Sequence, residues 1–334
     1  MKETKNKIKV DFDRTSKWER FKIKYLSFNF VGQVVFKLFR LVLLLGISYV
    51  ILFPFFSKIA SSFMSPEDFV NVTVRLIPKN PTLNTYKMII LENNYLNALI
   101  NTATLSLLCA IIQTFVTCVV GYGFGKYKFK GNGILFACVI LTMAIPHQMM
   151  KFSIFSEFRY FDIYGIIKLI KGDTIQLTNT YWPLAILSLT GLAYKNGLYI
   201  YMMRQFFRGV PDELEESAYI DGSGPFRTFL SIIIPLSVPM MITIFLFAFS
   251  WQWTDSFYSG LFFSGNRTTK LLPTIIVVPK TLNAIIQDGY AGANLYRQAI
   301  FNTCGLLIIA PLIVIYLFCQ RYLIQGIERS GITG

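Results

Sequence analysis

The carboxylates that could do chemistry in this chain gather in one stretch, residues 209–228, which lies between two long apolar segments. Clustered carboxylates can exchange protons, ligate a cation, or form a charged surface for another protein. Histidine is the side chain most often used in general acid–base catalysis, and this stretch contains none. We therefore interpret the stretch as a charged binding surface, and we expect neither a catalytic residue nor a metal ligand in the chain.

The single histidine and one glycine-rich run are the other candidates for chemistry, and neither fits a motif. His147 has no second histidine with which to share a metal ion, so we expect a structural or interfacial role. The alternate glycines of 121–125, followed by Lys126, superficially resemble a phosphate-binding loop. Their spacing is wrong, and Tyr127 stands where Ser or Thr is required. We expect these glycines to permit close helix packing, and we expect no ATP site in this chain.

Lys195, Asn196 and Tyr199 place polar groups inside the apolar segment 182–206. A charge at that depth is costly and usually faces a cavity or a partner. Tyr199 follows Lys195 by four residues and would share its helix face. Three interpretations stay open: this face lines a translocation path, Lys195 pairs with an acid on another subunit, or the helix is broken there and Lys195 reaches the surface.

A second polar group ends the apolar segment 229–253. Its members are Trp251, Gln252, Trp253 and Asp255. Aromatic rings bind the C–H faces of sugars, and amides and carboxylates bond sugar hydroxyls, so this chemistry suits a carbohydrate. Tryptophan also collects at membrane interfaces because its ring is amphipathic. Both interpretations stay open.

The elements that must position these residues follow from the composition. The chain is 54% hydrophobic and only 15% charged, whereas soluble proteins are about 25% charged. Each apolar segment is near the ~20 residues that cross a bilayer. The segments lie near 36–60, 97–124, 132–150, 182–206, 229–253 and 299–321. The sequence therefore predicts an all-α integral membrane protein, with one domain of six transmembrane helices over 31–334.

The basic residues indicate how the chain lies in the membrane. The formal net charge is +14, yet the basic residues form no single patch, so we expect no nucleic-acid partner. Aromatic residues recur every three or four positions within residues 1–30, which predicts an N-terminal helix in the lipid interface. A disordered tail is the alternative before residue 12. An even number of spans puts both termini on one side, and the basic N-terminus and Lys126 predict that this side is cytoplasmic.

Residues 209–228 are expected to fold as a short helix and a tight turn. Pro211 suits a first helical turn, and the carboxylates after it complement the helix dipole. Asp221, Gly222 and Ser223 supply the break, because glycine accepts backbone angles that other residues avoid. Pro225 restarts the chain before the next apolar segment. The orientation above places this helix in the cytoplasm.

The run ESAYIDG followed by PLSVP resembles the EAA loop of permeases of ATP-binding-cassette (ABC) importers. In that family the loop forms the coupling helix that docks on the ATPase. The lead-in RQFFRGVPDELEESAYIDG and the terminal GIERSGITG are similar to the sugar-importer branch, the relatives of the maltose-type permease. The positions that the resemblance covers are Glu215, Glu216, Ser217, Ala218, Asp221, Gly222 and Pro235. Ser217 departs from the alanine usual in the family.

The resemblance implies a type I permease of a bacterial plasma membrane, with a cytoplasmic coupling helix over about 209–228. It implies a second homologous permease subunit, two ABC ATPase subunits, an extracellular solute-binding protein, a carbohydrate substrate and membrane lipids as partners. ATP and magnesium would bind the ATPase subunits, and this chain would hold no cofactor. Ala218 would permit close seating in the ATPase groove.

Two other functions are weighed against this one. An ABC permease for amino acids, peptides or polyamines keeps the architecture and changes the substrate, whereas the lead-in and the tail favour a carbohydrate. A membrane-embedded enzyme acting on lipid or glycan would need histidine and carboxylates together near one face of the membrane. The acidic stretch lacks the histidine, which disfavours the enzyme.

Overall fold

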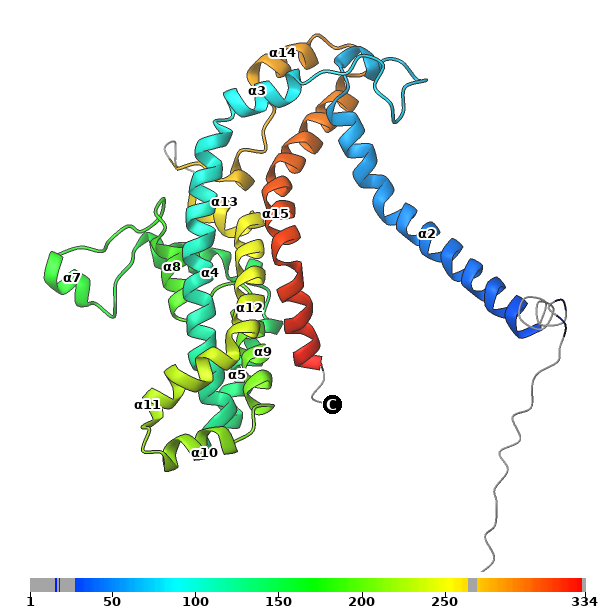
Figure 1. Cartoon of the computed structure of the whole chain (residues 1–334). Helices are drawn as coiled ribbons and strands as arrows, with labels where there is room; N and C mark the ends of the chain where they lie inside the picture. The colour runs from blue at the N-terminus through cyan, green and yellow to red at the C-terminus, as the bar shows by residue number, and fades with distance from the viewer. Residues whose placement is uncertain (1–15, 17, 19–27, 264–268, 332–334) are drawn as a thin grey trace, which may run out of the picture. The chain divides into compact units, whose positions relative to one another are not determined.

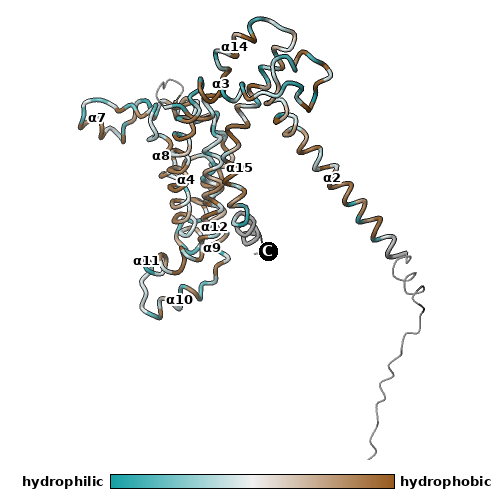
Figure 2. Tube along the Cα trace, turned by 45° about the horizontal axis from the view of Figure 1, so that its top comes forward, coloured by the Kyte–Doolittle hydropathy of each residue, from teal (hydrophilic) through white to brown (hydrophobic). Residues whose placement is uncertain are grey.

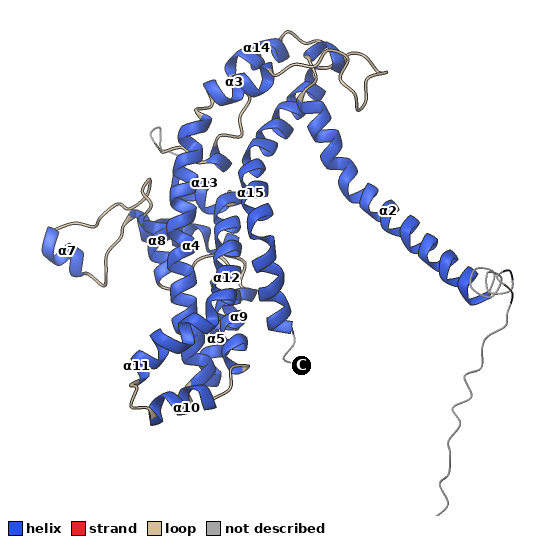
Figure 3. Cartoon of the chain, in the orientation of Figure 1, coloured by secondary structure: helices blue, strands red, loops and turns tan. Residues whose placement is uncertain are grey.

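The structure is a computed structural model of the chain, and it describes residues 16, 18, 28–263 and 269–331 (Figure 1). Every regular element within those residues is helical, and only two isolated β-bridges occur there (Figure 3). The prediction of an all-helical protein is confirmed. The predicted interfacial helix of residues 1–30 lies almost entirely outside the described residues.

Four helical stretches of the described chain are long and apolar enough to cross a membrane. They are Gly32–Ser62, Tyr95–Lys126, Pro225–Thr254 and Ala293–Tyr322. The first belongs to α2 (Phe28–Ser62), the second is α4 (Tyr95–Lys126), the third ends with α12 (Ile234–Thr254), and the fourth belongs to α15 (Ala293–Gly331). Figure 2 shows apolar residues along all four helices. The remaining two predicted spans are not single straight helices.

The predicted span 132–150 is sharply bent. α5 (Asn132–Ala144) ends before Pro146, and a 3₁₀ turn, η2 (His147–Met150), leads into α6 (Lys151–Arg159). The two parts are inclined at 89° to each other. Proline forces the residue before it out of the helical region, and Ile145 is indeed extended with ψ 119°. Counting this bent pair as one span gives five candidates.

The predicted span 182–206 is broken into α8 (Trp182–Leu189) and α9 (Asn196–Arg208). Gly191 has φ +73° and ends α8: its N–H bonds to the Ser188 carbonyl, and the Leu192 N–H bonds to the Leu187 carbonyl. This is the glycine-terminated helix end that satisfies the last carbonyls. A continuous helix over 182–206 was therefore the wrong expectation. Of the open interpretation that the helix is broken there and Lys195 reaches the surface, the break is confirmed, whereas Lys195 is half-buried.

α4 is the central helix of the unit formed by residues 59–334. It packs against α8, α9 and α12, and α12 in turn packs against α15. A side chain added at Gly121 would place its Cβ 2.4 Å from the Met203 Cβ, and one at Gly125 would lie 3.0 Å from the Phe207 Cβ. The predicted role of these two glycines in close helix packing is confirmed. Gly123 faces open space in this chain.

Shorter elements lie at both ends of this bundle (Figure 1). α10 (Glu213–Ile220) and α11 (Pro225–Thr228) lie at one end, and α3 (Asn84–Glu92) and α14 (Lys280–Gln287) lie at the other. The remaining elements are η1 (Pro66–Phe69), α7 (Ile166–Lys171), η3 (Phe229–Ile233), α13 (Phe257–Phe263) and η4 (Leu272–Thr274).

α2 is described by itself, because most of it belongs to a separate unit, residues 1–58. Its sequence is apolar on every side of the helix, Leu44 and Leu45 included. A helix that is apolar on every side is typical of a segment surrounded by lipid or by other membrane helices.

Candidate functional site

The acidic helix α10 is held to the end of α4 by one buried lysine. The Lys126 ammonium lies 2.5 Å from both the Val210 carbonyl oxygen and Asp212 Oδ1, and 3.9 Å from Glu215 Oε1. The Tyr122 hydroxyl donates to Glu215 Oε2 at 3.2 Å. The hydrogen bond from Lys126 lowers the pKa of Asp212, so this carboxylate is ionised at neutral pH. These contacts join the start of α10 to the end of α4.

The other end of α10 closes with a glycine turn. Gly222 has φ +83°, its N–H bonds to the Tyr219 carbonyl, and the Ser223 N–H bonds to the Ala218 carbonyl. This is the same helix-ending motif as at Gly191. The predicted break at 221–223 is confirmed, and it turns the chain into α11.

The predicted coupling residues fall on two faces of α10. Glu216, Ser217 and Asp221 are exposed, whereas the Glu215 side chain is only 12% exposed and faces Lys126. Ala218 is 6% exposed, so its methyl group packs mainly against this chain. Its close seating in an ATPase groove stays a prediction. The apolar residues exposed around this helix are Leu214, Tyr219, Ile220 and Phe226.

Pro235 lies apart from α10, at the start of α12. It follows η3, a π-helical turn, and its side chain is exposed. Proline has no N–H to give to the carbonyl four residues earlier, which removes one bond of a regular α-helix and favours the wider turn. The structure thus gives Pro235 a part in shaping the entry to α12.

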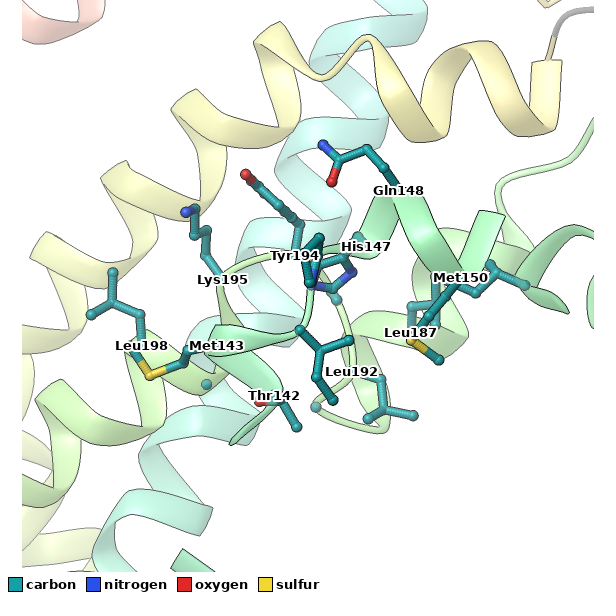
Figure 4. A pocket seen from close by; sticks show the side chains of 16 residues that line it. Thr142, Met143, His147, Gln148, Met150, Leu187, Leu192, Tyr194, Lys195 and Leu198 are labelled. Carbon is teal, nitrogen blue, oxygen red and sulfur yellow. The ribbon is translucent and has the colours of Figure 1, made fainter. Parts of the chain in front are cut away.

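A cavity of about 370 Å³ lies where both irregular segments meet (Figure 4). The bend after α5 and the break before α9 supply most of its walls. An adjoining cavity of about 200 Å³ shares His147, Gln148 and Tyr194 with it and adds Trp251 and Asp255. In Figure 4 the polar ends of Tyr194, Lys195 and Gln148 lie towards α12, opposite the apolar lining side chains. The cavities thus join a polar wall to an apolar one.

Lys195 and Trp251, predicted from two different segments, meet at this polar wall. The Lys195 ammonium lies 4.7 Å from the centre of the Tyr194 ring and 5.0 Å from that of Trp251. The two rings are 5.5 Å apart, and the His147 ring lies 5.1 Å from that of Tyr194. These distances are within the range of cation–π interactions. The backbone presents Lys195 here with φ +71°, directly before α9.

Four other predicted substrate residues do not line either cavity. Tyr199 is fully buried in the core, and Asn196 is buried with its amide nitrogen 3.4 Å from the Ser188 carbonyl oxygen. Trp253 is 2% exposed and its ring N–H donates to the Ile308 carbonyl at 2.9 Å. The Gln252 amide nitrogen is buried and has no hydrogen-bond partner among the described residues. The expectation that Tyr199 shares an open face with Lys195 is wrong.

Asp255 lines the smaller cavity, and its carboxylate also caps the start of α13. Its carboxylate accepts hydrogen bonds from the backbone N–H groups of Phe257, Tyr258 and Ser259, at 3.0–3.2 Å. These are the unpaired donors at the start of α13, and a carboxylate is well placed to satisfy them.

Tyr194, Gln148 and His147 are the cavity residues that sequence reasoning missed or assigned elsewhere. His147 was expected to be structural; its Nδ1 is indeed 2.7 Å from the Tyr258 hydroxyl, yet its ring also lines both cavities. Pro146 and Gly191 are the signals that could have located these residues, since both interrupt helices inside apolar runs.

The two tryptophans provide a stability test. Trp253→Phe removes the hydrogen bond to Ile308, so we expect about 1 kcal/mol of lost stability and a lower thermal midpoint. Trp251 is 46% exposed, so Trp251→Phe is expected to leave the midpoint unchanged. The measurement is a thermal melt of the purified protein in detergent. Equal effects of the two substitutions would contradict the structural role of Trp253.

Residues 117–329 match the model of the family described as "binding-protein-dependent transport system inner membrane component". The chain belongs to this family. As a family member it is a multi-pass inner-membrane subunit, the non-catalytic permease of an ABC transporter. The matched region contains α10, its lysine anchor and both cavities, so the features above belong to the permease domain.

Two curated transport permeases are similar in sequence to this chain over most of its length. The galactooligosaccharides transport system permease protein GanQ of Bacillus subtilis (strain 168) is 25% identical over 91% of this chain and 98% of its own. The polygalacturonan/rhamnogalacturonan transport system permease protein YtcP of the same strain is 23% identical over 87% and 96%. A solved bacterial ABC transporter involved in the import of the acidic polysaccharide alginate matches with a TM-score of 0.61 and 18% identity, covering 87% of this chain and 97% of that one. The last comparison shows a shared fold.

Proposed function

We propose that this permease imports a carbohydrate, as one of two homologous membrane subunits that assemble with two ABC ATPases and an extracellular solute-binding protein. The names of GanQ and YtcP support the cargo, since both proteins transport oligo- or polysaccharides. ATP and magnesium bind the ATPases. This permease contributes no catalytic or metal-binding residue.

The proposed topology has six spans and both termini in the cytoplasm. The bent pair α5–α6 and the broken pair α8–α9 count as one span each and complete the four candidate spans. Lys126, Lys128, Lys130, Arg204 and Arg208 lie near the α10 end of the bundle, in or beside short loops, where basic residues favour the cytoplasmic side. The loops at the other end also carry Lys and Arg, but they are longer, and long loops have little influence on orientation. This orientation exposes α10 to the ATPases and α3 and α14 to the binding protein.

The observation that carries the proposed coupling is the ionic anchor of α10 on α4. A partner that seats on exposed Glu216 and Ser217 displaces α10, and Lys126 passes the displacement to α4 through Val210, Asp212 and Glu215. α4 packs directly on α9 and α12. Packed helices shift between discrete arrangements, so closure of the ATPases can change access to the two cavities beside Tyr194.

Mild solubilisation of the tagged permease and mass spectrometry of the co-purifying chains test the assembly. We expect an ABC ATPase and a second permease. Ligand-stimulated ATP hydrolysis in reconstituted vesicles, with oligosaccharides compared with amino acids and peptides, tests the cargo. Recovery of this permease alone, under conditions that preserve other membrane complexes, would contradict the assembly, and stimulation by peptides alone would contradict the cargo.

The anchor itself yields a prediction. Lys126→Met removes a nearly buried ammonium, whose side chain is 6% exposed, and leaves Glu215 without its cation. We expect the free energy of unfolding to fall by about 2 kcal/mol. We also expect that ATP hydrolysis by the reconstituted transporter no longer responds to ligand. Lys128→Met is the matched control, since Lys128 is exposed. A normal ligand response in Lys126→Met would show that the anchor does not transmit motion.

A further inference from the structure

Lys195 is a cation at the wall of a cavity with no acid assigned to it. No carboxylate among the described residues lies within 4.0 Å of its ammonium, and its neighbours there are the rings of Tyr194 and Trp251. Lys195 is half-buried, so its ammonium loses some of its hydration, and contacts with two aromatic rings replace only part of that lost stabilisation. The site therefore has room for a negatively charged partner.

None of the other polar groups of the two cavities forms an ion pair with Lys195. Asp255 is the one acid that lines them, and it lines only the smaller cavity; its carboxylate accepts three backbone N–H groups at the start of α13 instead of the Lys195 ammonium. His147 uses Nδ1 with the Tyr258 hydroxyl. The Gln148 side chain is neutral, and its amide lies beside Tyr194 in Figure 4. An incoming anion would meet Lys195 without displacing an internal partner.

We propose that this cavity binds an acidic sugar, with the Lys195 ammonium pairing the sugar carboxylate. The inference rests on the carbohydrate function above and narrows its substrate to carboxylated sugars. Tyr194, and Trp251 at the mouth of the adjoining smaller cavity, contact the C–H faces of the sugar ring, and Gln148 bonds the sugar hydroxyls. The volume of about 370 Å³ falls within the ~300–1,000 Å³ of small-molecule sites. The apolar wall opposite limits the number of polar groups that the ligand can present.

Charge decides between an acidic and a neutral sugar. A neutral sugar of the same shape would fill the cavity and strip water from Lys195 without returning a negative charge. Sites that hold a polar group for recognition reject ligands that leave it unpaired. The carboxylate is thus the feature that distinguishes the accepted ligand, and Lys195 is the residue that determines this specificity.

The test uses the complete importer in lipid nanodiscs and follows the fluorescence of Trp251, whose ring lies 5.0 Å from the ammonium. Galacturonate and galactose are matched probes that differ by a carboxylate against a hydroxymethyl group, and acetate supplies the carboxylate without the ring. We expect a saturable response to galacturonate and responses weaker by about tenfold or more to the other two. Trp251→Phe identifies the reporter because the response disappears with the ring.

Substitutions at Lys195 complete the test. Lys195→Gln is expected to weaken the galacturonate response about tenfold or more, and Lys195→Arg to retain it. The methyl ester of galacturonate repeats the comparison on the unaltered protein, so the result does not depend on a variant that folds. Equal responses to galacturonate and galactose, an unchanged response in Lys195→Gln, or no response to galacturonate would each overturn the proposal. An equal response to acetate would overturn the assignment to a sugar.

Failure of the carbohydrate function is distinguishable from failure of this inference. If unaltered complexes respond to galactose and not to galacturonate, the importer carries sugars and the acidic class is wrong. If ATP hydrolysis responds to peptides and to no sugar, the carbohydrate function itself is wrong.

Discussion

Gly222→Asp is expected to abolish uptake while the protein still inserts and folds. The residue has φ +83°, where an aspartate costs about 1 kcal/mol, and an added Cβ meets nothing within 4 Å in this chain. The fold therefore tolerates the change. The new side chain and its charge project from the turn after α10, where we propose that the ATPase seats. The measurement is uptake by whole cells, with membrane insertion checked by immunodetection.

Glu216→Lys is the companion substitution and is expected to have the same result. Glu216 is exposed and makes no contact that holds α10 to α4, so its replacement changes the outer face alone. Glu213→Lys is the matched control, since it makes the same charge change in the first turn of the same helix. A charge reversal nearest the helix start disturbs the helix dipole most, so a general loss of helix stability would affect Glu213→Lys at least as much. Normal uptake by both Gly222→Asp and Glu216→Lys would rule out α10 as the coupling helix.

The sequence was sufficient to predict elements whose signal is local. α4, α12 and α15 follow from long apolar runs, and the turn after α10 follows from a glycine in an acidic stretch. The bend near Pro146 was missed, and the break at Gly191 was foreseen only as one of three interpretations of Lys195. Both lie within apolar runs whose average hydropathy hides a single helix-ending residue. Irregular backbone at membrane depth is tolerated where it lines a cavity or is buried in protein, and hydropathy alone cannot foresee such a position.

The candidate cavity was predictable only in part, because its walls come from segments distant in sequence. Lys195 was identified by the cost of a charge in an apolar run, and Trp251 by its ring, yet nothing in the sequence pairs them. Two residues along a helix turn the side chain to nearly the opposite side, which explains why Trp251 faces the cavity while Trp253 is buried against Ile308. Tyr199 is buried because the break at Lys195 starts a new helix with its own orientation.

Gly121→Val is expected to have the largest effect on the fold. A Cβ at this position would lie 2.4 Å from the Met203 Cβ and 3.1 Å from the Arg204 backbone nitrogen. Neither atom is the flexible end of a side chain, so α9 itself must move away from α4. Overpacking of this kind costs about 3 kcal/mol, and α9 leads directly to α10, so the coupling helix would be displaced as well.

Gly123→Val is the matched control for Gly121→Val, because nothing lies within 4 Å of a Cβ added at Gly123. Both substitutions place the same β-branched residue in α4, so they share any cost of helix propensity. We therefore expect a lower thermal midpoint and lower membrane yield for Gly121→Val alone. The same loss in Gly123→Val would mean that this second face of α4 also carries a close contact, and the second permease subunit is the partner that would supply it. No loss in Gly121→Val would contradict the packing of α4 on α9.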